Sequence, residues 1–329
     1  MEFTDLLNMM AQKKASDLFI TTDMAPSLKV NGVIAPVSKT PLNSRQTREL
    51  VLSIMNPEQR QEFLDTKECQ FAIATKDAGR FRVSAFFQRD DIGMVLRRIE
   101  SRIPNFEELN LPPVLKDLAM GKRGIVFFVG ATGTGKSTSL AAMVGYRNRN
   151  SSGHIISIED PIEFVHSHAG CIVTQREIGM DTESYGVALR NTLRQAPDVI
   201  LIGEVRTRDA MEYAITFAET GHLCLTTLHA NNANQALDRI LHFFPEDARD
   251  QILMDLSLNL RAIVAQRLIR KSDGSGRRAA VEVLINTPLA SDLIKKGDIH
   301  KLKDLMKRST EHGMITFDQC IYNLYRQGE

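Results

Sequence analysis

The segment GATGTGKS at residues 130–137 constrains the fold of this chain more than any other feature. It follows an apolar run at residues 124–129 and precedes a segment with helical spacing, at about residues 136–147. It matches the pattern G-x-x-x-x-G-K-[ST], in which glycines let the backbone turn tightly so that successive N–H groups face one concavity. The following helix directs its positive N-terminus at the same place. The segment therefore predicts a strand–loop–helix unit that holds the phosphates of a nucleotide.

Each part of this loop has an expected partner in ATP. Lys136 is expected to reach the β and γ phosphates, and Ser137 is expected to ligate Mg²⁺. A purely structural glycine-rich turn is the alternative, which the preceding strand and following helix disfavour. The expected nucleotide-binding residues come from the loop and the first turn of the helix: Gly130, Ala131, Thr132, Gly133, Thr134, Gly135, Lys136, Ser137 and Thr138.

The region around the loop alternates apolar runs with helical segments. The runs are residues 124–129, 154–158, 199–202 and 223–228. Continuous apolar strands separated by helices are typical of a parallel sheet that is buried on both faces. The pattern predicts an α/β domain at residues 123–329, in which residues 248–266 form one long helix and short, mostly helical segments follow.

The first 102 residues show a different, mixed α and β pattern. Asn31 and Gly32 separate two apolar runs, which predicts a β-hairpin with a type I′ turn. Residues 44–55 are expected to form a helix capped by Ser44, and residues 80–84 alternate as in a half-buried strand. Prolines punctuate residues 103–122, which we interpret as the linker between a domain at 1–102 and one at 123–329.

Charge and cysteine content disfavour several classes of protein. Lys and Arg number 41 against 40 Asp and Glu, so the chain lacks the basic excess typical of a motor that acts on nucleic acid. The four cysteines lie far apart, which disfavours a zinc site or a disulfide framework. No apolar run could span a bilayer and no leader is visible, so we expect a soluble, cytoplasmic protein.

Two acidic segments follow predicted strands. Glu204 comes directly after residues 199–203, where a P-loop NTPase needs a carboxylate near its magnesium ion; a solvated loop carboxylate is the alternative. The segment IEDPIE at residues 158–163 follows another strand, and we expect Glu163 to act as general base, with Glu159 and Asp160 as supporting acids. A solvated acidic turn is the other interpretation of this segment.

Histidines and arginines complete the candidate set. His222 and His229 flank the apolar run 223–228, and spacing alone is more typical of structural histidines, with only His229 at the ligand edge. A guanidinium often stabilises the charge of the transferred phosphoryl group. The candidates for this role are Arg80, Arg82, Arg97, Arg98, Arg194, Arg206 and Arg208, although any one of them is individually more typical of a surface residue.

The order of these segments resembles the secretion-type hexameric ATPases, and among them the type IV pilus retraction ATPases of the PilT/PilU group. The resemblance covers essentially the whole chain. It implies a PAS-like N-terminal domain at 1–102 and a RecA-like ATPase domain at 123–329 with a helical C-terminal segment, with ATP bound between the two domains. It assigns catalytic roles to Glu163, Glu204, Lys136, His229, His222, Arg82 and Arg97, and places Mg²⁺ at Ser137 and Glu204.

The resemblance also implies partners and a location. A homo-hexamer would act at the cytoplasmic base of the pilus, on an inner-membrane platform protein, with no nucleic acid and with membrane contact only through partners. Phe19 and residues 289–293 are more similar to the accessory PilU type, which implies dependence on a PilT-like retraction ATPase. The alternative is a nucleotide-binding regulatory or scaffold subunit with little turnover of its own.

Overall fold

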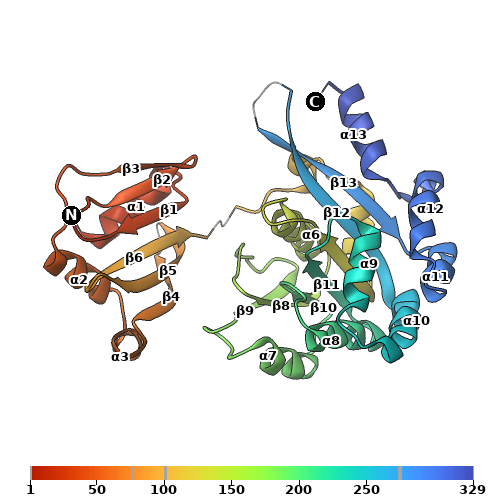
Figure 1. The fold of residues 1–329 in the computed structure, drawn as a ribbon, viewed down its shortest axis with the longest axis horizontal. Helices are drawn as coiled ribbons and strands as arrows, with labels where there is room; N and C mark the ends of the chain where they lie inside the picture. Colours follow the sequence, from red (N-terminus) through yellow and green to blue (C-terminus); the bar gives the residue numbers. More distant parts are fainter. Residues whose placement is uncertain (1, 76–77, 100–101, 273–275, 329) are drawn as a thin grey trace. The chain divides into compact units, whose positions relative to one another are not determined.

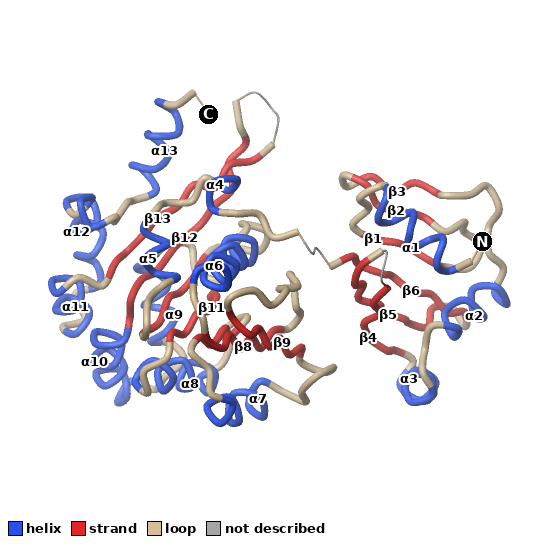
Figure 2. Tube along the Cα trace, turned by 180° about the vertical axis from the view of Figure 1, so that it is seen from behind, coloured by secondary structure: helices blue, strands red, loops and turns tan. Residues whose placement is uncertain are grey.

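The structure is a computed structural model that describes residues 2–75, 78–99, 102–272 and 276–328. The chain divides into two compact units, Met1–Ser101 and Arg102–Glu329 (Figure 1). Each unit has its own hydrophobic core and its own sheet (Figure 2). Within the described ranges, no helix combines the length and apolar character needed to cross a bilayer.

The first unit is an antiparallel sheet with three helices in the part that the structure describes. The strand order is β3-β2-β1-β6-β5-β4, and every neighbouring pair is antiparallel. The elements are α1 (Phe3–Gln12), β1 (Asp17–Ile20), β2 (Ser27–Val30), β3 (Val33–Pro36), α2 (Ser44–Ser53), α3 (Pro57–Thr66), β4 (Glu68–Thr75), β5 (Gly79–Gln88) and β6 (Asp91–Arg98).

Local sequence explains most of this unit. Asn31 and Gly32 have φ of 51° and 85°, as the type I′ turn requires, and they join β2 to β3. Phe81 and Val83 are fully buried on one face of β5, which confirms the expected alternation. One detail is wrong: Asn43, and not Ser44, caps α2, because the Asn43 side chain accepts a hydrogen bond from the backbone N–H of Gln46 at 2.9 Å.

The second unit contains a mainly parallel sheet of order β13-β12-β7-β11-β10-β8-β9, in which only β12 and β13 pair antiparallel among the described strands. This confirms the expected α/β class. Its strands are β7 (Gly124–Val129), β8 (Gly153–Glu159), β9 (Cys171–Glu177), β10 (Val199–Ile202), β11 (Leu223–Leu228), β12 (Leu260–Arg270) and β13 (Arg277–Ile285).

The helices of this unit cover both faces of the sheet and continue beyond β13. They are α4 (Phe106–Leu109), α5 (Val114–Ala119), α6 (Lys136–Asn150), α7 (Tyr185–Thr192), α8 (Arg208–Glu219), α9 (Ala233–Leu241), α10 (Arg249–Asn259), α11 (Pro288–Lys295), α12 (Leu302–Arg308) and α13 (Phe317–Arg326). Short 3₁₀ turns lie at Leu193–Gln195, Glu246–Ala248, Ile299–Lys301 and Thr310–His312. Helices α11, α12 and α13 gather on the β13 side of the sheet in both views (Figures 1 and 2).

The parallel register determines where a ligand can bind. The strands β7, β11, β10 and β8 are parallel neighbours, so their carboxyl ends share one edge of the sheet. Strands β7, β10 and β11 are buried along their whole length. The loops that leave this edge therefore carry the polar side chains, as in other open α/β sheets.

Residues 103–122, the predicted linker, contain two short helices that pack on the second unit. Their two helices, α4 and α5, contact α6, and the side chains of Phe106, Leu111, Leu115 and Leu118 are buried in the core of the second unit. The prolines shape short connections between these helices, while the apolar residues between them pack against the rest of the second unit.

The long helix expected at residues 248–266 is wrong. Helix α10 ends at Asn259, and β12 begins at Leu260, where it pairs in parallel with β7 and antiparallel with β13. Leu, Ala, Arg and Gln favour helices locally, so pairing with a central strand overrides the local preference. This change inserts β12 next to the phosphate loop.

Candidate nucleotide-binding and catalytic site

The loop between β7 and α6 has the backbone that its glycines predict. Gly130, Gly133 and Gly135 have φ of 157°, 78° and 86°, conformations that other residues rarely adopt. A Cβ at Gly130 would lie 2.6 Å from the carbonyl oxygen of Gln266, whereas Gly133 faces open space. The first glycine therefore allows close packing beneath the loop, and the middle one leaves its outer side accessible.

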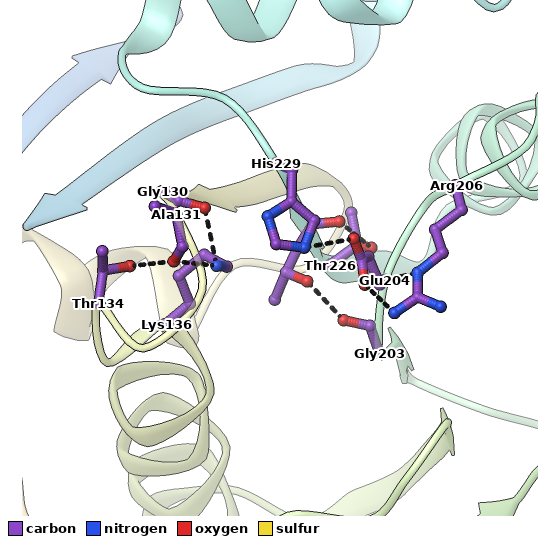
Figure 3. A network of polar contacts seen from close by, with 10 residues as sticks. Gly130, Ala131, Thr134, Lys136, Gly203, Glu204, Arg206, Thr226 and His229 are labelled. Atoms are coloured by element: carbon purple, nitrogen blue, oxygen red, sulfur yellow. Dashed lines mark hydrogen bonds and ion pairs between the residues drawn. The ribbon is translucent and has the colours of Figure 1, made fainter.

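Lys136 begins α6 and folds back over the loop. Its Nζ donates hydrogen bonds to the carbonyl oxygens of Gly130 at 2.8 Å and Ala131 at 2.9 Å (Figure 3). Burial lowers the pKa of Lys136, and the carboxylate of Glu204 opposes that shift. The ammonium group therefore lies at the loop and in electrostatic contact with the acid that ends β10.

Glu204 lies between two basic side chains. Its Oε1 is 2.9 Å from Nε2 of His229, and its Oε2 is 2.7 Å from Nη2 of Arg206 and accepts a hydrogen bond from Arg206 Nε at 2.8 Å (Figure 3). Only 16% of the Glu204 side chain is exposed. The hydroxyl of Thr227 donates to the carbonyl oxygen of Gly203 at 2.7 Å, which joins the end of β11 to the turn that carries Glu204.

The acidic segment after β8 contains one tethered carboxylate, Glu159, and two exposed ones, Asp160 and Glu163. Glu159 accepts hydrogen bonds from Ser157 Oγ at 2.7 Å and Gln175 Nε2 at 3.2 Å, and burial raises its pKa. Buried Glu177 accepts from the backbone N–H of Ile162 at 3.2 Å and so holds the segment from below. The Glu163 side chain is exposed. Asp160 is exposed as well, so exposure leaves both Glu163 and Asp160 available to a water molecule, and the resemblance favours Glu163.

Two further residues of this site, Tyr185 and Gln266, belong to no sequence motif. The Tyr185 hydroxyl lies 3.1 Å from the position that a Cβ on Gly203 would occupy, between the two acidic segments. Burial, and then the nearby Asp160 and Glu159, raise the pKa of Tyr185. Gln266 lies under the phosphate loop, where its Nε2 donates to the carbonyl oxygen of Thr134 at 2.9 Å. Because residue 266 was expected to lie in a helix, nothing in the sequence pointed to this position for Gln266.

The structure separates the two histidines that the resemblance groups together. His229 follows the carboxyl end of β11, whereas His222 precedes its amino end, where its Nδ1 lies 3.0 Å from Thr220 Oγ1. Because β11 has six residues and runs parallel to β7, His222 lies about 20 Å from the phosphate-loop edge of the sheet. Of these two histidines, His229 is the one that contacts Glu204.

Arg82 and Arg97 lie in the first unit. They are directly paired across β5 and β6, and Nε of Arg97 lies 2.9 Å from Oδ1 of buried Asp17. The two guanidinium groups therefore emerge from neighbouring positions of one sheet.

The residues present fit a nucleotide with a magnesium ion. Glycines make the cradle, and Ser137, exposed in the first turn of α6, offers a hydroxyl oxygen. Glu204 offers carboxylate oxygen, and oxygen donors are the ligands that Mg²⁺ prefers. Among the residues described, no group of three or more His, Cys, Asp and Glu side chains could hold a metal ion, so phosphate and water would have to complete the coordination.

The fold and this site define a P-loop nucleotide-binding protein with a RecA-like domain. Residues 3–316 match the family described as Type II/IV secretion system protein, and the chain belongs to that family. It is 68% identical over 329 residues to the "Type IV pilus ATPase PilU" of Pseudomonas aeruginosa, covering 100% of this chain and 86% of that relative. It is 39% identical over 328 residues to the "Type IV pilus retractation ATPase PilT" of the same species, covering 100% of this chain and 95% of that relative.

Solved structures agree with the sequence relatives. The structure described as "Crystal Structure of the Pilus Retraction Motor PilT and Bound ADP" superposes with a TM-score of 0.93 at 37% identity, covering 100% of this chain and 94% of that one. The Legionella pneumophila ATPase DotB superposes with a TM-score of 0.81 at 26% identity, covering 99% and 92%. The resemblance to secretion ATPases, and to the PilU type among them, is confirmed.

Proposed function

We propose that this chain is a Mg²⁺-dependent ATPase of the type IV pilus, which hydrolyses ATP to drive or assist pilus retraction and twitching motility. One observation carries the proposal: the phosphate loop with Lys136 and the Glu204–His229 pair lie at the same edge of the sheet. The relatives named above, a type IV pilus ATPase and a retraction ATPase, support the biological setting.

The chemistry follows from charge and position. When bound, Mg²⁺ neutralises part of the phosphate charge and polarises the terminal phosphoryl group. Lys136 and the loop N–H groups bind and orient the phosphates. Ser137 and Glu204 would bind the cation through their side-chain oxygen atoms. His229 and Arg206 fix the orientation of the Glu204 carboxylate. Glu163 accepts a proton from the attacking water.

The assembly and partners belong to the same proposal. We place the chain in a homo-hexamer at the cytoplasmic face of the inner-membrane pilus base, with Arg82 and Arg97 as proposed catalytic residues. The platform protein and a PilT-like retraction ATPase are the proposed partners, and nucleic acid is not. The similarity to PilU, together with Phe19 and residues 289–293, supports the accessory role.

The same similarity favours a second candidate, a nucleotide-binding regulatory subunit with little turnover. The two functions differ in the hydrolysis rate of the isolated chain and in the effect of a PilT-like partner. Steady hydrolysis by the purified chain alone contradicts the regulatory role. Hydrolysis seen only with the partner, and lost when this chain cannot bind nucleotide, contradicts independent motor action.

The decisive experiment uses the purified full-length chain with Mg·ATP. We expect hydrolysis that ceases on chelation of Mg²⁺, and rings of six subunits in negative-stain images with nucleotide. Lys136→Ala should abolish nucleotide binding, while Lys122→Ala, which removes an exposed lysine just before β7, should leave binding and hydrolysis intact. Equal hydrolysis by the wild type and Lys136→Ala would overturn the assignment of the site.

A further inference from the structure

We infer that Gln266 is a positioning residue that sets the shape of the phosphate loop. The inference rests on the proposed ATPase function and adds a residue that lies outside the sequence motifs. Its position follows from the sheet. Ala265 of β12 pairs with Val129, the last residue of β7, so Gln266 of β12 lies beside Gly130, the first residue of the loop.

The backbone of Gln266 forms the floor of the loop. A Cβ on Gly130 would lie 2.6 Å from the Gln266 carbonyl oxygen, closer than any real side-chain carbon tolerates. Because φ at Gly130 is 157°, the position favours glycine for its conformation as well. The strand therefore presses against the beginning of the loop.

The carboxamide of Gln266 connects the loop to α6. Only 2% of the residue is exposed. Its Nε2 donates to the carbonyl oxygen of Thr134 at 2.9 Å, and its Oε1 accepts from Ser139 Oγ at 2.8 Å. A Cβ on Gly135 would lie 2.7 Å from that Nε2, so the amide also lies directly against the last glycine of the loop.

This arrangement needs an uncharged group with one donor side and one acceptor side. A glutamate would lose the bond to Thr134 and add negative charge beside the phosphate site, and an alanine would lose both bonds. Since Gln266 is only 2% exposed and its two polar ends contact the loop and α6, we take the residue to act through the loop and not on the phosphates directly.

The consequence concerns affinity more than the chemical step. The loop holds three glycines, and because glycine is conformationally permissive, contacts from the surroundings are needed to hold the loop in one shape. When a smaller fraction of molecules has the competent loop, the apparent affinity for nucleotide falls by that fraction. Removing Gln266 should therefore raise KM for ATP about tenfold while kcat changes less than about threefold.

The test measures steady-state hydrolysis and fluorescent-ATP binding of the full-length chain carrying Gln266→Ala, Ser139→Ala or both. If Gln266 connects Ser139 to Thr134, Ser139→Ala should raise KM by a smaller factor than Gln266→Ala. The double variant should match Gln266→Ala, since both changes break the same connection. Ile263→Ala is the matched control, because it truncates a fully buried side chain of β12 that points to the other face of the sheet. It should lower the melting temperature and leave KM unchanged.

Each outcome distinguishes this inference from the proposed function. If the wild type hydrolyses ATP and Lys136→Ala does not, but Gln266→Ala and Ser139→Ala both keep the wild-type KM, the positioning role is wrong and the ATPase assignment holds. If KM rises equally in Ile263→Ala, loss of stability explains the effect and the inference is overturned. If Gln266→Ala does not fold, Ser139→Ala and its KM decide alone. If the wild type neither binds nor hydrolyses ATP, the proposed function itself fails.

Discussion

Nε2 of His229 lies 2.9 Å from Oε1 of Glu204, so the histidine that ends β11 and the acid that follows β10 form one unit at the phosphate-loop edge. Arg206 holds the other oxygen of the same carboxylate. A carboxylate fixed from both sides keeps its orientation without reorganisation during the reaction, which is what electrostatic catalysis requires.

Removing this histidine should therefore slow the chemical step. We expect His229→Ala to lower kcat by about 10- to 100-fold with a smaller change in KM, because Glu204 loses one of its two fixed partners. Steady-state kinetics with Mg·ATP measure both constants.

His222→Ala provides the comparison for that prediction. Its ring lies beyond the other end of β11, so the loss of kcat should be several-fold smaller than for His229→Ala. Equal losses would show that position relative to the phosphate loop within one chain does not decide the role of these histidines.

The two glutamates of the acidic segment should respond differently to the same chemical change. Glu163→Gln should lower kcat at least about 100-fold and leave nucleotide affinity and melting temperature unchanged, because its exposed carboxylate is the proposed base. Glu159→Gln should act mainly on stability, since its carboxylate is held by Ser157 and Gln175. Thermal melts and single-turnover hydrolysis separate the two effects. A normal chemical step in Glu163→Gln would exclude it as the base.

The central part of the fold could be predicted because its local and long-range preferences agree. The loop motif lies between a continuous apolar strand and a helix, and Glu204 directly follows the fully buried β10. Both features place polar groups at the carboxyl ends of parallel strands, so the sequence alone was enough to bring Lys136 and Glu204 to one edge.

Residues 248–266 could not be predicted in the same way. Helix-forming residues continue from α10 across Asn259 into β12, and an apolar run such as 262–265 suits a buried helix or a buried strand equally well. Pairing with β7 decides between them, and that pairing joins residues more than 130 positions apart, such as Ile125 and Leu260. Gln266 was missed for the same reason.

The proline-containing segment before β7 offers a stability test. Leu115→Ala should lower the free energy of unfolding of the second unit by about 2–5 kcal/mol, because Leu115 is fully buried in its core. Asp117→Ala on the same helix changes an exposed residue and should cost less than about 0.5 kcal/mol. Calorimetry of the full-length chain measures both. A negligible effect of Leu115→Ala would show that residues 103–122 contribute little to the stability of the second unit.

His166 should make the second unit sensitive to mild acid. Burial, and then the nearby Arg149, lower the pKa of His166 from 6.5 to about 4. The folded state therefore favours the neutral ring. The contribution of neutral His166 to the free energy of unfolding is complete above pH 6.5 and is lost as pH falls toward 4. That contribution amounts to about 3 kcal/mol at most.

The measurement is the melting temperature between pH 4.5 and 7. His166→Gln should flatten the decline below pH 6.5, because a glutamine cannot take up the proton. His242→Gln, at an exposed histidine, should leave the decline unchanged. Identical profiles for the wild type and His166→Gln would show that other groups cause the acid sensitivity.

Arg97 requires a test that separates its two roles. Its Nε lies 2.9 Å from Oδ1 of Asp17, whose side chain is 5% exposed, so Arg97→Ala leaves a buried carboxylate that still accepts a hydrogen bond from Ser16 Oγ at 2.8 Å. We expect a loss of about 1–2 kcal/mol in the stability of the first unit, because that carboxylate loses its charged partner. The second change Asp17→Asn removes the buried charge and should restore most of that stability.

If Arg97 also contacts the nucleotide in the assembled ring, hydrolysis by Asp17→Asn/Arg97→Ala should stay at least about tenfold below the Asp17→Asn single variant. Recovery of hydrolysis together with stability would limit Arg97 to its ion pair with Asp17.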